Sequence, residues 1–148
     1  MAASIITCAA CGRRNRVPAA GSGVPRCAAC GTALPWIAEA SDEDFEEVAE
    51  RSSVPVLLDL WADWCAPCRQ VTPMVERVAA TFAASLKVVK VDVDRSPTVA
   101  ARFEVRGIPT LIVLLEGREV DRVVGVPPEE QLPTRIEAAI GMSTADAR

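Results

Sequence analysis

The sequence predicts an α/β domain with a mixed central β-sheet flanked by helices, preceded by a small cysteine-rich module. Three observations support this class: strand-like apolar runs alternate with helical patterns, all six cysteines fall in Cys-x-x-Cys pairs, and charge is unevenly distributed. Residues 1–35 contain four arginines and no acid, whereas the other 12 basic residues and all 20 acidic residues follow. We therefore expect a module in residues 1–35 and a domain in residues 36–148.

The domain begins with a strand, a helix and a second strand. Residues 36–40 read as a short strand. Ser41 is the expected N-cap of an acidic helix over residues 43–50. The nearly continuous apolar run at residues 54–61 indicates a central strand buried on both faces.

A long helix and a further strand and helix come next. We expect the long helix over residues 65–84, interrupted at Pro73 with a kink there, because proline cannot complete an interior helical hydrogen bond. The alternating pattern at residues 87–94 predicts a strand, and residues 96–105 predict a short helix.

A hairpin and an amphipathic helix complete the order βαβαβαββα. Residues 110–124 form the expected hairpin, which turns at residues 116–117. The last helix is expected over residues 127–140, with a distortion at Pro133. Residues 142–148 read as a frayed tail. This order indicates a mixed sheet within one α/β domain.

Composition excludes several classes of protein. No apolar run approaches the roughly 20 residues that span a bilayer, and the N-terminus lacks the basic start of a secretory signal, so we expect a cytoplasmic protein without membrane association. The chain has no histidine, which excludes imidazole metal ligands and His-based catalytic pairs. In a reducing cytosol, paired cysteines bind metal or act in catalysis more often than they form structural disulfides.

The first two cysteine pairs share the sequence CAACG and are separated by 15 residues, a spacing typical of a structural zinc site with four thiolate ligands. Their members are Cys8, Cys11, Cys27 and Cys30. Gly12 and Gly31 suit the left-handed turn of a zinc knuckle, and metal binding explains how residues 1–35 fold without a large apolar core. The alternative is two local disulfides, or thiols without a role.

The third pair, Cys65 and Cys68, lies between a predicted strand and a predicted helix, and Pro67 suits the first helical turn. A helix N-terminus stabilises a thiolate, so Cys65 can attack a disulfide and Cys68 can release the mixed disulfide that forms. The alternative is half of a metal site that bridges two chains. The pattern favours thiol–disulfide exchange.

The segment LLDLWADWCAPCRQVTP resembles the active-site segment of thioredoxins, and RGIPT followed by a hairpin and VVG resembles their second signature. The likeness covers about residues 37–141 and implies the thioredoxin fold and protein-disulfide reduction. With the two preceding pairs, the chain resembles the zinc-containing thioredoxin 2 subfamily of bacteria, with a zinc-ribbon-like module. Thioredoxins usually have Gly-Pro between the cysteines, whereas this chain has Ala66-Pro67, which leaves the redox potential open.

Asp59 is the only charged residue in its apolar run, and an unpaired buried carboxylate is costly. The resemblance implies that it lies behind the disulfide and accepts a proton from Cys68, with burial raising its pKa. It also implies that Lys90, on the next strand, pairs with Asp59. The alternatives are a solvent-facing aspartate at a strand edge and a plain surface lysine.

The resemblance further implies a cis peptide bond before Pro109 and a flat apolar surface around the disulfide, where an extended substrate segment binds. The residues expected in this surface are Trp64, Gly107, Ile108, Gly125 and Val126.

The leading hypothesis is a thioredoxin-type reductase of protein disulfides that serves thiol redox homeostasis. By resemblance, its partners are thioredoxin reductase, which supplies electrons from NADPH, and disulfide-containing proteins. We expect a monomer with structural zinc and no bound organic cofactor. A thiol oxidase or isomerase is one alternative, and a redox domain delivered by a zinc-module adaptor or redox sensor is another. Residues 1–35 contain no aromatic residue to stack on bases, so nucleic acid is not expected.

Overall fold

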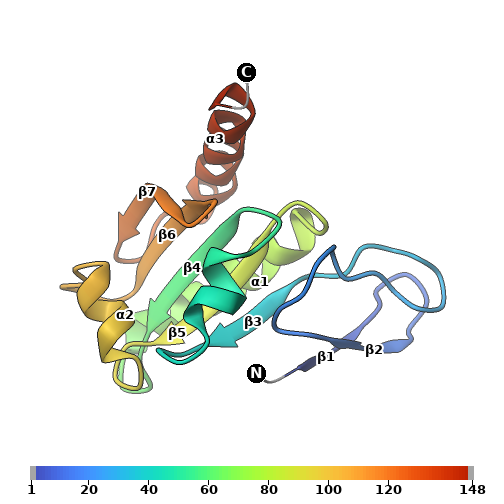
Figure 1. Ribbon diagram of the computed structural model, residues 1–148, viewed down its shortest axis with the longest axis horizontal. Coiled ribbons are helices and arrows are strands. Elements are labelled where there is room, and N and C mark those ends of the chain that lie inside the picture. The colour runs from blue at the N-terminus through green and yellow to red at the C-terminus, as the bar shows by residue number, and fades with distance from the viewer. Residues whose placement is uncertain (1–2, 147–148) are drawn as a thin grey trace.

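The computed structural model describes residues 3–146 and places five strands in one mixed sheet (Figure 1). The order across the sheet is β3-β5-β4-β6-β7. Strands β3, β5 and β4 are parallel, whereas β6 and β7 are antiparallel to their neighbours. The strands are β3 (Ile37–Ala40), β4 (Val56–Trp61), β5 (Lys87–Asp92), β6 (Thr110–Leu115) and β7 (Arg118–Val124). The mixed sheet and the predicted order of elements are both confirmed.

Helices cover both faces of this sheet, because alternate residues of each buried strand point to opposite sides. On one side, Leu57 lies in an apolar cluster with residues of α1 (Ala66–Thr81) and α3 (Gln131–Asp146). On the other side, Leu58 lies in a cluster with residues of η1 (Glu46–Glu50) and α2 (Pro97–Arg102). Strand β4 therefore contributes to two cores, as its continuous apolar run predicted.

The helical segment after β3 differs from the prediction. It is a single π-helical turn, η1, and the expected N-cap hydrogen bond from the Ser41 side chain is absent from the described chain. Instead, the Asp44 carboxylate accepts a hydrogen bond of 2.8 Å from the backbone N–H of Ser41. The prediction of an N-capped helix over residues 43–50 was therefore wrong in its start and its cap.

The predicted break of the helix at Pro73 is also wrong, because α1 continues through this residue; the kink expected there stays a prediction. Contacts of its apolar face with the sheet, made by Val71, Val75 and Val78, hold the helix together across the proline. Pro133 causes no interruption either. It is the third residue of α3, where a backbone N–H has no intrahelical partner in any case.

The two ends of the hairpin region complete the domain. Glu116 and Gly117 form the predicted turn, both with positive φ (51° and 78°), as expected for a two-residue hairpin loop. Residues 142–146 continue α3 rather than forming a frayed tail, and residues 147–148 of that expected tail lie outside the described chain. No helix in residues 3–146 combines the length and the apolar character needed to cross a bilayer.

The N-terminal residues form a separate two-stranded antiparallel sheet of β1 (Ser4–Thr7) and β2 (Arg14–Val17). Figure 1 shows this sheet beside β3, at the edge of the main sheet. Trp36 packs against a small cluster with Val17 and Leu34, and its Nε1 donates a hydrogen bond of 2.9 Å to the Pro18 carbonyl. Trp36, which directly precedes β3, is therefore part of the small core of the N-terminal segment.

A buried lysine joins the module to the domain. Lys87 is 1% exposed and donates to the carbonyl oxygens of Ala19 in the module and Val48 in η1, the latter at 2.6 Å. Its ammonium also lies 4.3 Å from the centroid of the Trp36 ring. Burial lowers the pKa of Lys87 to about 8. The alternating pattern of residues 87–94 did not predict this buried charge.

Candidate redox site and four-cysteine cluster

Cys65 and Cys68 form a disulfide at the N-terminus of α1, which follows the central strand β4. Cys65 is the N-cap of the helix, and its Sγ accepts a hydrogen bond of 3.2 Å from the backbone N–H of Cys68. Pro67 lies in the first helical turn, as predicted. Both cysteines are buried in this oxidised form. The unpaired N–H groups and the helix dipole at this position stabilise negative charge on a thiolate of the reduced form.

The Ile108–Pro109 peptide bond is cis, which confirms the conformation implied by the resemblance. Thr110, which opens β6, pairs with Val124 of β7. The Pro109 carbonyl accepts a hydrogen bond of 2.8 Å from the backbone N–H of Gly125, which has a φ of 90°. Gly125 therefore takes part in holding the loop that contains the cis bond.

Asp59 lies in the middle of β4 and is 1% exposed. Its Oδ1 has no hydrogen-bond partner within the described residues. Burial raises the pKa of this carboxyl to about 6, and the positive charge of Lys90 opposes part of that rise. The burial of Asp59 thus accounts for the expected direction of the pKa shift.

Lys90 lies directly opposite Asp59 in the register of β4 and β5. No carboxylate of residues 3–146 lies at ion-pair distance from its ammonium, which is instead 5.3 Å from the centroid of the Trp61 ring. Lys90 therefore acts on Asp59 through its field rather than through a direct ion pair.

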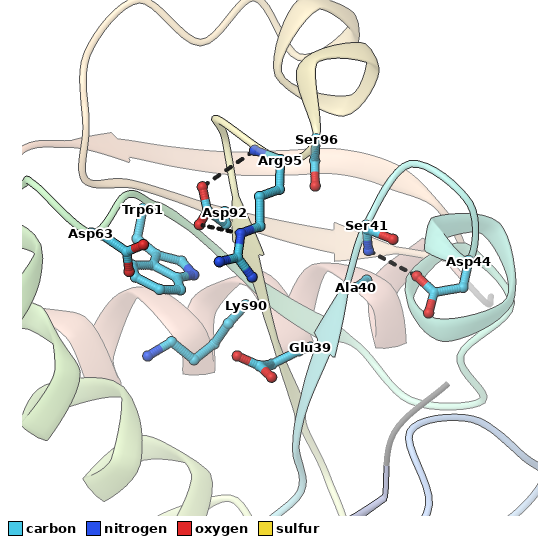
Figure 2. A pocket seen from close by; sticks show the side chains of 10 residues that line it. All are labelled: Glu39, Ala40, Ser41, Asp44, Trp61, Asp63, Lys90, Asp92, Arg95 and Ser96. Atoms are coloured by element: carbon cyan, nitrogen blue, oxygen red, sulfur yellow. Dashed lines mark hydrogen bonds and ion pairs between the residues drawn. The ribbon is translucent and has the colours of Figure 1, made fainter.

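Lys90 and Trp61 together line two cavities. Figure 2 shows the first, of about 330 Å³, where Lys90 and Trp61 lie near the carboxylates of Glu39 and Asp63. The second, of about 350 Å³, is lined by Cys68 as well as by Trp61 and Lys90. The ammonium thus borders a space that reaches the second cysteine of the redox pair.

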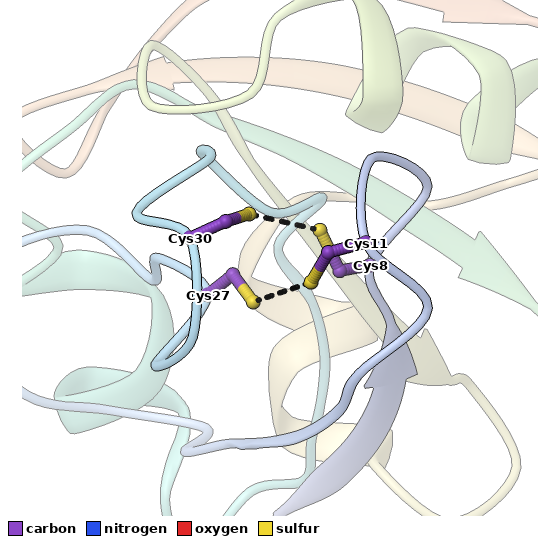
Figure 3. Close-up of side chains that lie close together, drawn as sticks. All are labelled: Cys8, Cys11, Cys27 and Cys30. Atoms are coloured by element: carbon purple, nitrogen blue, oxygen red, sulfur yellow. Dashed lines mark hydrogen bonds between the residues drawn. The ribbon is translucent and has the colours of Figure 1, made fainter.

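The four N-terminal cysteines converge on one point between two loops (Figure 3). All four Sγ atoms lie within 4.8 Å of one another. The pairs Cys8–Cys30 and Cys11–Cys27 have Sγ–Sγ distances of 3.7 and 3.5 Å. A tetrahedral zinc site with Zn–S bonds of about 2.3 Å requires Sγ–Sγ distances of about 3.8 Å. The donor set and its spacing therefore fit zinc.

The two cysteine loops have the same backbone structure. In each, the first cysteine donates its N–H to the residue five positions later, and the glycine after the second cysteine donates back to the first cysteine (Gly12 to Cys8, Gly31 to Cys27). These glycines have φ of 80° and 77°, which confirms the predicted left-handed turns. A hydrogen bond from the Cys30 backbone N–H is the main cause that lowers the pKa of Cys27 to about 6, whereas, against a backbone hydrogen bond at Arg13, contacts with the neighbouring thiols and burial raise the pKa of Cys11 to about 12.

Asn15 connects the two loops, and the sequence analysis did not identify it. It is 7% exposed, accepts a hydrogen bond of 3.0 Å from the N–H of Ala28, and donates one of 3.1 Å to the Arg13 carbonyl. The only signal in the sequence was a lone asparagine between arginines, which is a common pattern on surfaces.

An apolar groove lies beside the redox site and includes three of the five residues expected there, Trp64, Gly107 and Ile108. Trp64 is 69% exposed, and its Nε1 donates a hydrogen bond of 2.8 Å to Asp94. Gly125 and Val126 do not line this groove. Val126 instead packs against the cluster beneath α1 and α3.

The structure adds residues to the apolar surface that the sequence did not indicate. Val124 is 64% exposed, and its Cγ1 would lie 3.6 Å from a Cβ placed on Gly107. Arg106 lines the groove and places a positive charge beside it. Val124 ends a strand whose apolar residues look alike in sequence, so its exposure became clear only from the structure.

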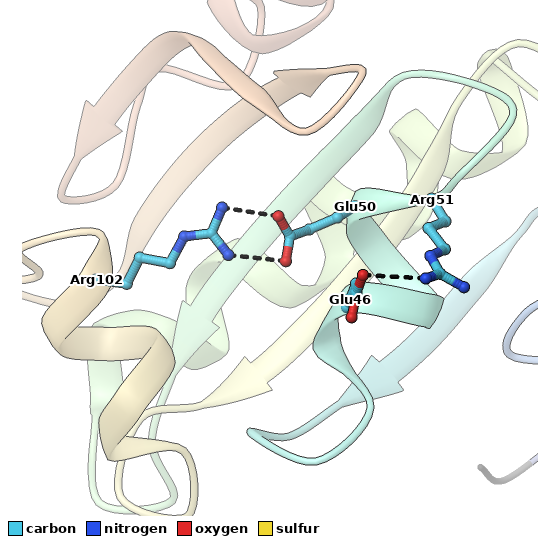
Figure 4. A network of polar contacts seen from close by, with 4 residues as sticks. All are labelled: Glu46, Glu50, Arg51 and Arg102. Carbon is cyan, nitrogen blue, oxygen red and sulfur yellow. Dashed lines mark hydrogen bonds and ion pairs between the residues drawn. The ribbon is translucent and has the colours of Figure 1, made fainter.

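Helix α2 supplies one wall of this groove through Pro97 and Ala100. A bidentate salt bridge holds the helix: the two terminal nitrogens of Arg102, Nη1 and Nη2, each donate to one oxygen of the Glu50 carboxylate at 2.8 Å (Figure 4). The Arg102 guanidinium also lies 5.1 Å from the Phe103 ring centroid. The groove wall is therefore fastened to η1.

Comparisons with known proteins agree with this geometry. A family model described as "Thioredoxin" matches residues 36–138. The chain is 42% identical over 100 residues to "Thioredoxin 1" of Synechococcus elongatus, covering 68% of this chain and 94% of that protein. It is 44% identical over 96 residues to "Thioredoxin" of Staphylococcus aureus, covering 65% and 90%. It is 38% identical over 104 residues to "Thioredoxin" of Pyropia yezoensis, covering 70% and 97%.

Proposed function

Because the chain belongs to the thioredoxin family, we propose a division of roles among its residues for the reduction of protein disulfides. The activity itself follows from the family and from the Cys65–Cys68 pair, whose disulfide at a helix N-terminus is the observation that carries this conclusion. The chain is therefore a disulfide oxidoreductase of the thioredoxin type.

In the first step, the Cys65 thiolate attacks one sulfur of a substrate disulfide. The substrate S–S bond breaks, a mixed disulfide forms between Cys65 and the substrate, and the other substrate sulfur leaves as a thiolate that takes up a proton. Cys65 is the proposed nucleophile because it is the N-cap of α1, where the helix stabilises its charge.

In the second step, the Cys68 thiol gives its proton to Asp59 and attacks Sγ of Cys65. The mixed disulfide breaks, the Cys65–Cys68 disulfide forms, and the substrate leaves fully reduced after gaining two electrons. Asp59 is suited to this role because a pKa of about 6 lets its carboxylate accept a proton near neutral pH. We place Lys90 as the cation that moderates this pKa.

The substrate surface is proposed to consist of Trp64, Gly107 and Ile108, together with Val124 from the structure. This surface is apolar and exposed next to the cis peptide bond, and it suits an extended segment recognised through shape and backbone. Gly125 has a supporting role through its hydrogen bond to Pro109, and Val126 supports the surface from beneath.

We further propose that residues 1–35 are a zinc module, that residues 36–148 are the thioredoxin domain, and that the chain belongs to the zinc-containing thioredoxin 2 subfamily. Cys8, Cys11, Cys27 and Cys30 would hold one structural zinc ion, whose binding stabilises the fold of the module. Thioredoxin reductase and disulfide-containing proteins are the proposed partners, and the cytoplasm is the proposed location, since a reductant works in a reducing compartment.

Single-cysteine variants and a redox titration test these assignments. Cys65→Ser should abolish reduction of a model protein disulfide, whereas Cys68→Ser should trap the substrate as a stable mixed disulfide. Turnover by Cys65→Ser would exclude Cys65 as the nucleophile. Equilibration with glutathione or dithiothreitol should give a potential near the thioredoxin value of about −270 mV, and a value near about −180 to −120 mV would indicate a thiol oxidase instead.

A further inference from the structure

Three charged residues form a row across the main sheet. Lys90 of β5 is the register partner of Glu39 in β3 on one side and of Asp59 in β4 on the other. Register partners on neighbouring strands point to the same face of a sheet. The row therefore places a lysine between two carboxylates on one face.

The apolar neighbours identify this face independently. The residues two positions earlier on the three strands all contact the cluster beneath α1 and α3; they are Ile37, Leu57 and Val88. Because side chains alternate along a strand, Glu39, Asp59 and Lys90 share the face that α1 covers. This is also the helix that carries Cys68.

Burial differs steeply along the row. Asp59 is fully buried, Lys90 is half-buried and Glu39 is exposed. Neighbouring strands lie about 4.8 Å apart, so the two carboxylate-bearing strands are separated by about 10 Å, with Lys90 between them. Figure 2 shows the side chains of Glu39 and Lys90 next to each other, and both residues line two shared cavities.

We propose that Glu39 is a positioning residue for disulfide exchange: its carboxylate competes with Asp59 for the charge of Lys90 and so keeps Asp59 able to hold a proton near neutral pH. The inference rests on the proposed role of Asp59 as the proton acceptor for Cys68. It adds a residue outside the redox motif, on the edge strand of the parallel part of the sheet.

The other charged groups around Lys90 are already engaged or stand outside the register row. Asp92 on the same strand accepts hydrogen bonds from backbone N–H groups of residues 94 and 95, and Asp44 accepts one from Ser41. The remaining charged residues in the two cavities that Lys90 shares with Trp61 are Asp63, Arg69 and Arg95. The described N-terminal residues that line the third cavity with Lys90, Ala3, Ser4 and Ile6, carry no charge.

Removing the Glu39 charge acts on Asp59 in one direction by two routes. Lys90 loses its competing anion and can turn toward Asp59, which strengthens its field there, and a like charge two strands away from Asp59 disappears. Both changes favour the ionised form of Asp59 and lower its pKa. Because Glu39 is exposed, screening by salt reduces the effect, and we expect a shift of about half a pH unit at low ionic strength.

The experiment compares Glu39→Gln with the matched control Glu47→Gln in the full-length, zinc-loaded protein. Glu47 is an exposed acid on η1, which packs on the opposite face of the sheet, so this control removes the same charge without touching the row. The carboxyl carbon of Asp59 is titrated by NMR in the reduced protein. The pH dependence of mixed-disulfide resolution is measured by rapid mixing.

In Glu39→Gln, the Asp59 midpoint and the midpoint of the resolution step should both fall by about half a unit, and 0.5 M salt should remove most of the shift. Glu47→Gln and the conservative Glu39→Asp should stay near the wild-type values. An unchanged Asp59 midpoint in Glu39→Gln would overturn the role of Glu39 and leave the proposed function intact. If Asp59→Asn leaves the pH profile of resolution unchanged, the proton-acceptor role of Asp59 fails, and the inference fails with it.

Discussion

The two kinds of Cys-x-x-Cys segment in this chain have the same spacing and opposite local structures. In the module, each pair is followed by a glycine with positive φ, which turns the backbone back toward the first cysteine. In the domain, Pro67 and the residues after Cys68 continue into α1. The turn directs four sulfurs toward one point, whereas the helix brings two sulfurs into a disulfide at its positive end. The residues that follow the cysteines, and not the spacing, separate the two chemistries.

The sharpest test of this contrast compares two serine variants, each of which should lose one function and keep the other. Cys65→Ser should reduce disulfide turnover to the background rate and retain one zinc per chain. Cys27→Ser should lose the zinc, because structural zinc contributes about 10 kcal/mol or more and depends on all four ligands, yet keep turnover with dithiothreitol. Zinc is measured by atomic absorption. Loss of turnover in a folded Cys27→Ser protein would show that the two regions act as one site.

Asp59→Asn should change the free energy of unfolding through the domain that holds the redox pair. The folded pKa of about 6 lies above the ordinary value of 3.8, so the folded state binds the Asp59 proton more tightly, and the free energy of unfolding falls as pH rises from about 4 to about 6. Above about pH 6, the buried charge therefore lowers the free energy of unfolding by its full amount. At pH 7 we expect Asp59→Asn to be more stable by up to about 3 kcal/mol.

That gain should disappear near pH 4, where the wild-type carboxyl is protonated in the folded state. Denaturant unfolding of the oxidised protein at pH 4, 5.5 and 7 measures it. Equal stability of the two proteins at all three pH values would mean that the Asp59 charge costs nothing in the fold.

A glycine–alanine exchange tests the local structures directly. Gly31→Ala should destabilise the module by about 1–2 kcal/mol through left-handed strain alone, since no atom lies within 4 Å of the added Cβ. Ala66→Gly restores the residue usual in thioredoxins and should cost about 0.5 kcal/mol, because glycine weakens a helix. Zinc retention against a chelator reports the first change, and denaturant unfolding reports the second. If the Gly31→Ala protein keeps zinc as tightly as the wild type, the left-handed turn at residue 31 does not contribute to zinc binding.

A modest effect on the module is expected at Asn15, which connects the two cysteine loops. Asn15→Ala leaves the N–H of Ala28 without its acceptor and should cost about 1 kcal/mol, equivalent to an increase of about fivefold in zinc release to a chelator. The redox reaction should not change. An unaltered rate of zinc release would show that the loops hold their positions without this connection.

Several features followed directly from the sequence because they depend on neighbouring residues. The left-handed turns at Gly12 and Gly31 and the hairpin turn at residues 116–117 are local, since the backbone conformation there is set by one or two residues. The helix start at Cys65 is local for the same reason. Strand β4 was recognisable because burial on both faces requires a continuous apolar run.

Predictions that relied on local rules failed where packing or position overrides them. Ser41 and Pro73 carry the residue types of a helix start and a helix break, but α1 continues through Pro73 because its apolar face packs on the sheet. The resemblance supplied the cis bond at Pro109, which the residues alone do not determine.

Tertiary structure alone decided which residues of different strands, and of the N-terminal segment and the main sheet, contact one another. Lys87 and Lys90 are three residues apart in one strand, so they point to opposite faces: one is buried beneath the module, and the other stands between Glu39 and Asp59. The sequence by itself determined the order of elements, the turns and the local backbone of each cysteine pair, because those depend on residues close together along the chain. Strand register brings together residues that are distant in sequence, and only the folded sheet fixes that register.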